Sequence, residues 1–66
     1  MRDNRKAYLV EVGEGRFYRL TDTLGRMMTT ERLAEAMLFD KPREACRVSL
    51  LFDVKGRQAT ARAMTV

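Results

Sequence analysis

The 66-residue sequence contains no histidine, no tryptophan, one proline and one cysteine. Without histidine, the usual general base and the histidine-activated serine and cysteine nucleophiles are missing. A zinc site of the Cys/His type is excluded for the same reason. The single cysteine, Cys46, cannot form an internal disulfide and is typical of a reducing compartment. We therefore expect a protein that is not an enzyme and has no metal ion and no cofactor.

Long hydrophobic runs are also missing. No apolar run approaches the roughly 20 residues that a membrane-spanning helix needs. The N-terminal segment 1–10 is basic and then apolar, but charge returns at Glu11 and no cleavage-like segment follows. The sequence thus predicts a mature cytoplasmic protein without a membrane partner.

The charge is basic but mixed. The chain has 13 Lys and Arg residues against 9 Asp and Glu residues, a net charge of +4. Because both signs alternate along the sequence, two interpretations remain open. One is an ordinary solvated surface, and the other is a basic patch for nucleic acid.

The length of 66 residues indicates a single domain over residues 1–66. A domain of this size buries only about 60% of the surface that its unfolded chain exposes. A modest self-sufficient core, a homodimer and stabilisation by a bound target are therefore three open alternatives. Residues 1–5 form a short polar lead, which we expect to be flexible.

Strand signals mark both ends of the chain. Alternating side chains with β-branched and aromatic residues predict a strand over Lys6–Val12. Gly13-Glu14-Gly15 predicts a tight turn, and residues 16–20 predict the return strand of a β-hairpin. In residues 57–66, alanines alternate with larger side chains, which predicts a terminal strand with a helix as the alternative.

The stretch 40–56 predicts the longest helix, around which we expect the fold to be organised. Asp40 is placed to cap its N-terminus, and Pro42 suits its first turn. Gly56 is a good C-terminal stop. One face carries the apolar residues that we expect to be buried, namely Ala45, Val48, Leu51 and Phe52.

A connection over residues 21–28, with a short extended piece at Met27 and Met28, is expected after the hairpin. A second, shorter helix over residues 31–38 is expected before the long helix. Phe39 precedes the Asp40 cap, where a hydrophobic residue can staple onto the following helix and fix the angle between the two helices. The order ββααβ predicts an α+β fold. Its three-stranded antiparallel sheet consists of the hairpin and the C-terminal strand, with both helices on one face.

Such a sheet leaves its second face bare. That face would carry Leu9, one aromatic of the pair Phe17 and Tyr18, Arg19, Arg62 and Met64. An aromatic flanked by arginines suits base stacking with phosphate contacts. It equally suits a protein interface, where Tyr, Met and Arg are enriched. A dimer face and a plain amphipathic surface are the alternatives.

The long helix and the connection offer two further candidate contacts. Arg43 and Arg47 lie one helical turn apart, and Leu50 and Val54 continue the same stripe. A solvated face is the alternative interpretation of this stripe. The segment Arg26, Met27 and Met28 is the third candidate, because exposed methionines adapt to many partners.

The segment 30–45, TERLAEAMLFDKPREA, resembles a pattern found in very small proteins of phages and mobile elements. In those proteins a hairpin with aromatics leads to a short helix and an Ala-x-x-Phe step, and a capped Glu-Ala helix and a last strand follow. Ala36 to Phe39 and Glu44-Ala45 match these two motifs. The resemblance implies a compact ββαβ-type fold without a defined activity. Proteins of this kind are often inhibitors of host machinery, and anti-CRISPR proteins are examples.

The sequence therefore favours a non-enzymatic binding protein, encoded by a phage or prophage, that inhibits or modulates a host protein or nucleoprotein complex. One alternative is a nucleic-acid-binding module that uses the bare sheet face. The other is a small self-assembling structural subunit, for which a homodimer is the simplest form.

Overall fold

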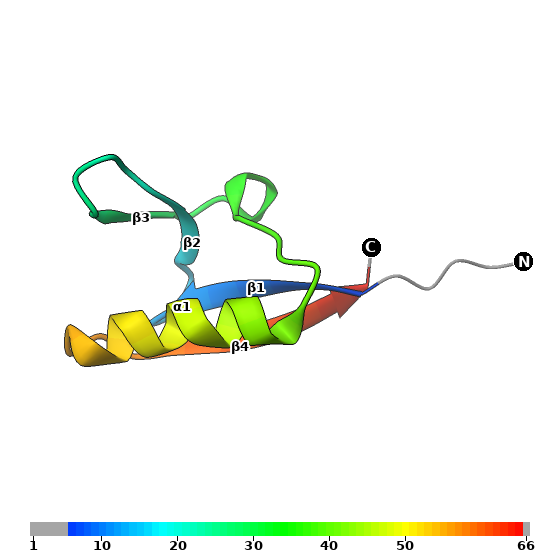
Figure 1. Ribbon diagram of the computed structural model, residues 1–66. Coiled ribbons are helices and arrows are strands. Elements are labelled where there is room, and N and C mark those ends of the chain that lie inside the picture. Colours follow the sequence, from blue (N-terminus) through cyan, green and yellow to red (C-terminus); the bar gives the residue numbers. More distant parts are fainter. Residues whose placement is uncertain (1–5, 66) are drawn as a thin grey trace, which may run out of the picture.

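The computed structural model describes residues 6–65, which form one antiparallel sheet and one α-helix (Figure 1). The elements are β1 (Lys6–Val12), β2 (Phe17–Thr21), β3 (Met27–Thr30), the 3-10 turn η1 (Leu33–Glu35), α1 (Pro42–Val54) and β4 (Ala59–Thr65). The strand order is β3-β2-β1-β4. The α+β class is confirmed, but within the described residues the sheet has four strands instead of three and there is one α-helix instead of two. The expected flexible lead at residues 1–5 lies outside the described residues.

The longest paired ribbon of the sheet joins the two ends of the described chain. β1 and β4 pair in one unbroken antiparallel register from Lys6 opposite Thr65 to Val12 opposite Ala59. The terminal strand predicted from the alternating alanines is therefore confirmed, and its helical alternative is wrong. The side chains of Ala59 and Ala61 pack against the core below α1.

The second strand leaves β1 soon after the hairpin turn. β1 and β2 share one residue pair, Glu11 opposite Phe17, and residues 37–39 take up backbone bonds on both strands beyond it. The N–H of Met37 donates to the Tyr18 carbonyl of β2 at 2.9 Å. Phe39 and Tyr8 of β1 exchange two backbone hydrogen bonds of 2.7 and 2.9 Å.

This pairing corrects the prediction of a helix over residues 31–38. The only helical turn there is η1, Ala36 behind it has extended backbone angles, and Phe39 forms a β-bridge with Tyr8. A helix of two turns is marginal by itself, so backbone bonds to two strands outweigh the local helical pattern. Phe39 consequently acts as a strand residue against β1 and does not set an angle between two helices.

The core lies between α1 and one face of the sheet. Val10 and Phe52 are fully buried, and Val12, Tyr18 and Ala45 complete the buried cluster. The Tyr18 ring stacks on Phe39 at 6.1 Å and meets the Phe52 ring edge-on at 6.0 Å. Aromatic pairs with these geometries are favourable beyond the area that they bury.

The N-terminus of α1 differs from that of the predicted helix 40–56, whereas its C-terminus ends as expected. Asp40 makes no capping bond, and Lys41 occupies the N-cap position with extended backbone angles. The cause is Pro42, because a proline disfavours helical dihedrals at the residue before it. At the other end Gly56 adopts φ +79° as expected, and the N–H of Arg57 donates to the Phe52 carbonyl at 3.0 Å.

The buried face of α1 is narrower than predicted. Ala45 and Phe52 are buried and Val48 is half-buried, whereas Leu51 remains 51% exposed. The sheet below the helix meets only the side centred on Ala45 and Phe52, so the prediction of a buried Leu51 is wrong.

Candidate interaction surfaces

The side of α1 that faces away from the sheet carries a stripe of two cationic and two apolar side chains. We call it the α1 stripe, and it consists of Arg43, Arg47, Leu50 and Val54. At about 100° per residue these four positions lie opposite Ala45 and Phe52. Leu50 is 61% and Val54 85% exposed, and both arginines are exposed as well. The helical spacing in the sequence therefore placed these four residues correctly on one exposed side of α1.

The arginines of the stripe differ from the other arginines of residues 6–65 in what they contact. Five arginines pair with carboxylates, namely Arg16, Arg19, Arg26, Arg32 and Arg62. The guanidinium group of Arg57 lies over the Phe52 ring, 5.5 Å from its centroid. Arg43 and Arg47 form no ion pair with any residue that the structure describes. Their charges remain available to an acidic partner.

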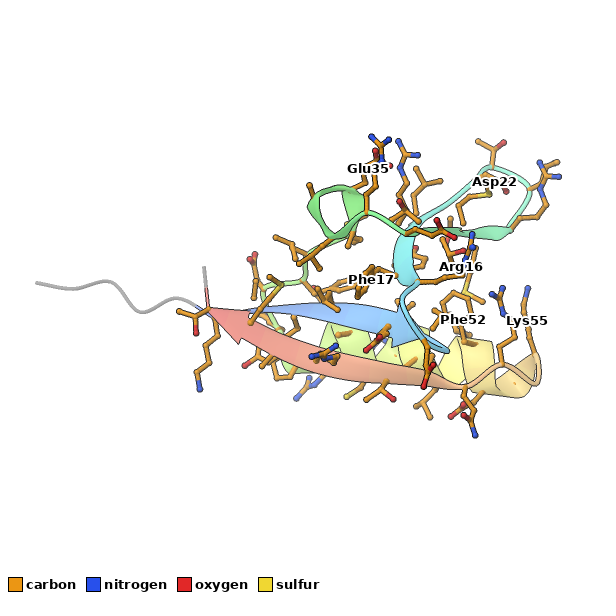
Figure 2. The ribbon with its side chains drawn as sticks, turned by 180° about the vertical axis from the view of Figure 1, so that it is seen from behind. Arg16, Phe17, Asp22, Glu35, Phe52 and Lys55 are labelled. Carbon is orange, nitrogen blue, oxygen red and sulfur yellow. The ribbon has the colours of Figure 1, made fainter. Side chains whose placement is uncertain are left out.

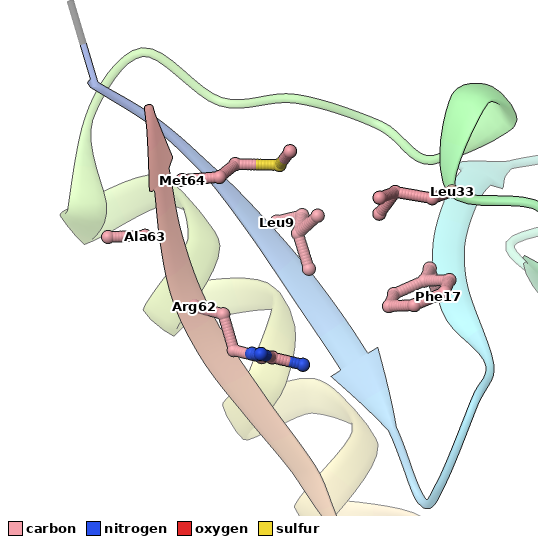
Figure 3. A pocket seen from close by; sticks show the side chains of 6 residues that line it. All are labelled: Leu9, Phe17, Leu33, Arg62, Ala63 and Met64. Atoms are coloured by element: carbon pink, nitrogen blue, oxygen red, sulfur yellow. The ribbon is translucent and has the colours of Figure 1, made fainter. Parts of the chain in front are cut away.

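A second surface is a hollow on the sheet face opposite α1 (Figure 3). It has a volume of about 140 Å³ and is lined by Leu9, Phe17, Leu33, Arg62, Ala63 and Met64. The sequence placed Leu9, Arg62, Met64 and one aromatic on this face, and the structure identifies the aromatic as Phe17. Tyr18 is buried in the core.

The hollow is not the bare sheet face that we expected. The η1 turn contributes Leu33 to its wall, and Leu9 is only 3% exposed. Sequence reasoning missed Leu33, because its spacing to Ala36 and Met37 indicated a helix on the opposite side. The only signal for its position is the pairing of residues 37–39 with β1 and β2, which a local pattern does not contain.

The cation beside the hollow is already neutralised. Arg62 donates to the Glu11 carboxylate at 2.7 Å, and the N–H of Gly15 donates to the same carboxylate at 3.2 Å. The Gly15 hydrogen bond and then the Arg62 guanidinium lower the pKa of Glu11. On the neighbouring strand, Arg19 lies 3.8 Å from Glu35. The arginines that we expected to meet phosphates on this face thus have carboxylate partners.

The third candidate segment lies on the β2–β3 connection, at the Asp22 end of the molecule in Figure 2. Asp22 accepts hydrogen bonds from the backbone N–H groups of Leu24 and Arg26 and from the Arg26 side chain. The Arg26 backbone bond contributes most to the lowered pKa of Asp22. Met27 packs against the core and Met28 is 46% exposed. This segment therefore offers a partner one exposed methionine, Met28, and one arginine, Arg26, that already pairs with Asp22.

The eight candidate residues from the sequence thus fall on separate parts of the fold. The structure brings Arg62 together with Met64 in the hollow, and Arg43 with Arg47 on α1. Arg19 belongs to β2, and Arg26, Met27 and Met28 belong to the β2–β3 hairpin.

Among residues 6–65 there is no group of three His, Cys, Asp or Glu side chains that would hold a metal ion. No helix in this part of the chain is long and apolar enough to cross a bilayer. Comparison with protein-family models, with curated proteins and with solved structures finds no match for this chain. A functional proposal therefore depends on the surfaces themselves.

Proposed function

We propose that the chain is a non-enzymatic binding protein that docks the α1 stripe on a partner protein, at an apolar patch flanked by carboxylates. The observation that carries this proposal is the composition of the stripe. Two exposed apolar side chains continue a line of two arginines without carboxylate partners among the described residues. Covering Leu50 and Val54 gains about 25 cal/mol for each Å² of apolar area removed from water. Arg43 and Arg47 select the partner by its charge.

A protein partner suits the stripe better than a nucleic acid does. Leu50 and Val54 gain little from a hydrated phosphate backbone. The hollow with Phe17, which was the candidate platform for base stacking, has its arginine paired with Glu11.

The resemblance to small phage and mobile-element proteins supports a host protein or nucleoprotein complex as the target. In this proposal the chain inhibits or modulates that target by occupying a surface, since the sequence has no histidine for acid–base chemistry.

The test compares three forms of the protein in affinity capture from host lysate, with and without nuclease. The stripe variant carries Arg43→Ala and Arg47→Ala. Its control carries Lys6→Ala and Lys55→Ala, which remove the same charge from exposed positions outside the stripe. Wild type and control are expected to retain the same protein in the presence of nuclease. The stripe variant should bind the purified partner about tenfold more weakly, because two exposed ion pairs contribute up to about 1 kcal/mol each.

Equal binding by the stripe variant would refute the proposal. If capture depends on intact nucleic acid, and the purified protein binds DNA or RNA with a steep loss of affinity as salt rises, direct nucleic-acid binding replaces it.

A further inference from the structure

The outer edge of β4 presents a row of backbone groups without partners among residues 6–65. Tyr8 directs its N–H and C=O to Phe39, away from β4, whereas the N–H of Gly13 donates to the Gln58 carbonyl. In an antiparallel ladder the bonding direction alternates along each strand. The register of β1 with β4 therefore points the backbone groups of four β4 residues to the free edge, namely Ala59, Ala61, Ala63 and Thr65.

This edge lacks the devices that usually protect an exposed strand. Such devices are short length, bulges, prolines and lysines. β4 has seven residues in unbroken register and contains neither proline nor lysine. Its one charged residue, Arg62, is paired with Glu11. The opposite edge strand, β3, has four residues, and its pairing with β2 contains a register shift.

We propose that β4 pairs antiparallel with β4 of a second copy of this chain, about a two-fold axis at Ala61. The two sheets then form one continuous sheet with the β4 strands at its centre. In this register Ala61 faces its own counterpart, and Ala59 faces Ala63 of the second copy. These pairs use the backbone groups that point outward, and they form about six hydrogen bonds between the copies. A second copy is a suitable partner because β4 can pair with itself. Each β4 strand offers the same outward-pointing N–H and C=O groups at Ala59, Ala61 and Ala63.

The side chains of β4 select this register. On the α1 side, alanine methyl groups meet at the seam, because Ala61 faces Ala61 and Ala59 faces Ala63. On the opposite side Thr60 faces Arg62 of the second copy. A shift of the axis to Arg62 would place two arginines directly opposite each other, and like charges in that position are destabilising.

Figure 1 shows that α1 lies over the face of the β1–β4 ribbon, and the strand order puts β4 at the end of the sheet. The outer edge of β4 is therefore accessible to another strand, whereas α1 covers one face of the β1–β4 ribbon. The seam uses β4 and leaves the α1 stripe exposed, so this inference does not depend on the proposed function.

Ala61→Pro tests the pairing. The substitution removes an N–H that points to the free edge and places the proline ring against the incoming strand, while the bonds from β4 to β1 remain. Sedimentation equilibrium over a wide concentration range should show a dimer for wild type. For the variant, association should weaken on the order of 100-fold, since two hydrogen bonds between copies are lost at about tenfold each. Leu50→Ala on α1 is the control and should dimerise as wild type does.

Amide hydrogen exchange of the wild type provides a readout that does not depend on the variant folding. At high concentration the Ala61 and Ala63 amides should be protected, and on dilution they should exchange quickly. The Arg62 and Met64 amides, which bond to β1, should stay protected at both concentrations. A single-chain mass at all concentrations with rapidly exchanging Ala61 would overturn the proposal. A dimer that Leu50→Ala disrupts and Ala61→Pro leaves intact would also overturn it.

Discussion

Phe52→Ala should remove much of the stability of this fold. Phe52 is fully buried, its ring meets Tyr18 edge-on at 6.0 Å, and the Arg57 guanidinium lies 5.5 Å from its centroid. Truncation of a buried phenylalanine costs about 3–5 kcal/mol. At about 0.05–0.15 kcal/mol per residue, a chain of this length has a free energy of unfolding of about 3–10 kcal/mol. The variant is therefore expected to lose between a third and all of its stability.

Urea unfolding followed by far-ultraviolet circular dichroism measures this loss. Leu50→Ala is the matched control, because it truncates a residue of the same helix that is 61% exposed. Its cost should stay within about 0.5 kcal/mol. Phe52→Leu supplies a measurable intermediate of about 1–2 kcal/mol if the alanine variant is already unfolded. If Phe52→Ala and Leu50→Ala unfold at the same urea concentration, the core cannot be centred on Phe52.

Three further predictions concern the turns and ion pairs. Gly56→Ala should cost about 1–2 kcal/mol in the same urea assay, because φ +79° is unfavourable for alanine and no neighbouring atom lies close enough to add a clash; an unchanged midpoint would contradict this. The pKa of Glu11 is lowered in the folded state, so its contribution to stability is present above the ordinary value of 4.5 and is lost as the pH falls through the lowered value. Glu11→Gln should therefore destabilise the protein at neutral pH and make little difference in strong acid, and a difference that grows in acid would refute the assignment. Asp22→Ala should speed amide exchange of Leu24 and Arg26 while leaving α1 unchanged, and equal exchange rates in both proteins would show that the carboxylate does not order the turn.

The parts of the fold that the sequence predicted correctly are governed by local signals. The bounds of β1 follow from the alternation of Lys6–Val12 and the glycine turn behind it. The C-terminal stop of α1 follows from Gly56. The predicted cap at Asp40 was wrong, although its cause is also local, because Pro42 moves the N-cap to Lys41.

The remaining errors have long-range causes. The pattern of residues 31–38 favours a helix, and it is overridden because Met37 and Phe39 bond to strands from the beginning of the chain. β3 was expected only as a short extended piece at Met27 and Met28, since two methionines give a weak strand signal. Backbone pairing with β2 makes residues 27–30 a regular strand.

The candidate surfaces divide in the same way. Helical periodicity alone placed the four residues of the α1 stripe on one side of the helix. The difference between Arg47 and Arg62 was not predictable, because the carboxylate partner of Arg62 is 51 residues away in the sequence. Ion pairing of this kind depends on the sheet register, which the sequence pattern left undetermined.

The long register between β1 and β4 has a consequence for how the protein folds. These strands form the best-paired ribbon of the sheet, yet residues 13–58 separate them in the chain. Closing so long a loop costs entropy before any strand bond is formed, and folds dominated by distant contacts form slowly. During synthesis, β1 leaves the ribosome first and has no β4 to pair with until residues 59–65 follow. The nascent chain therefore carries Leu9, Val10 and Val12 on a strand that lacks its β4 partner until residues 59–65 have been made.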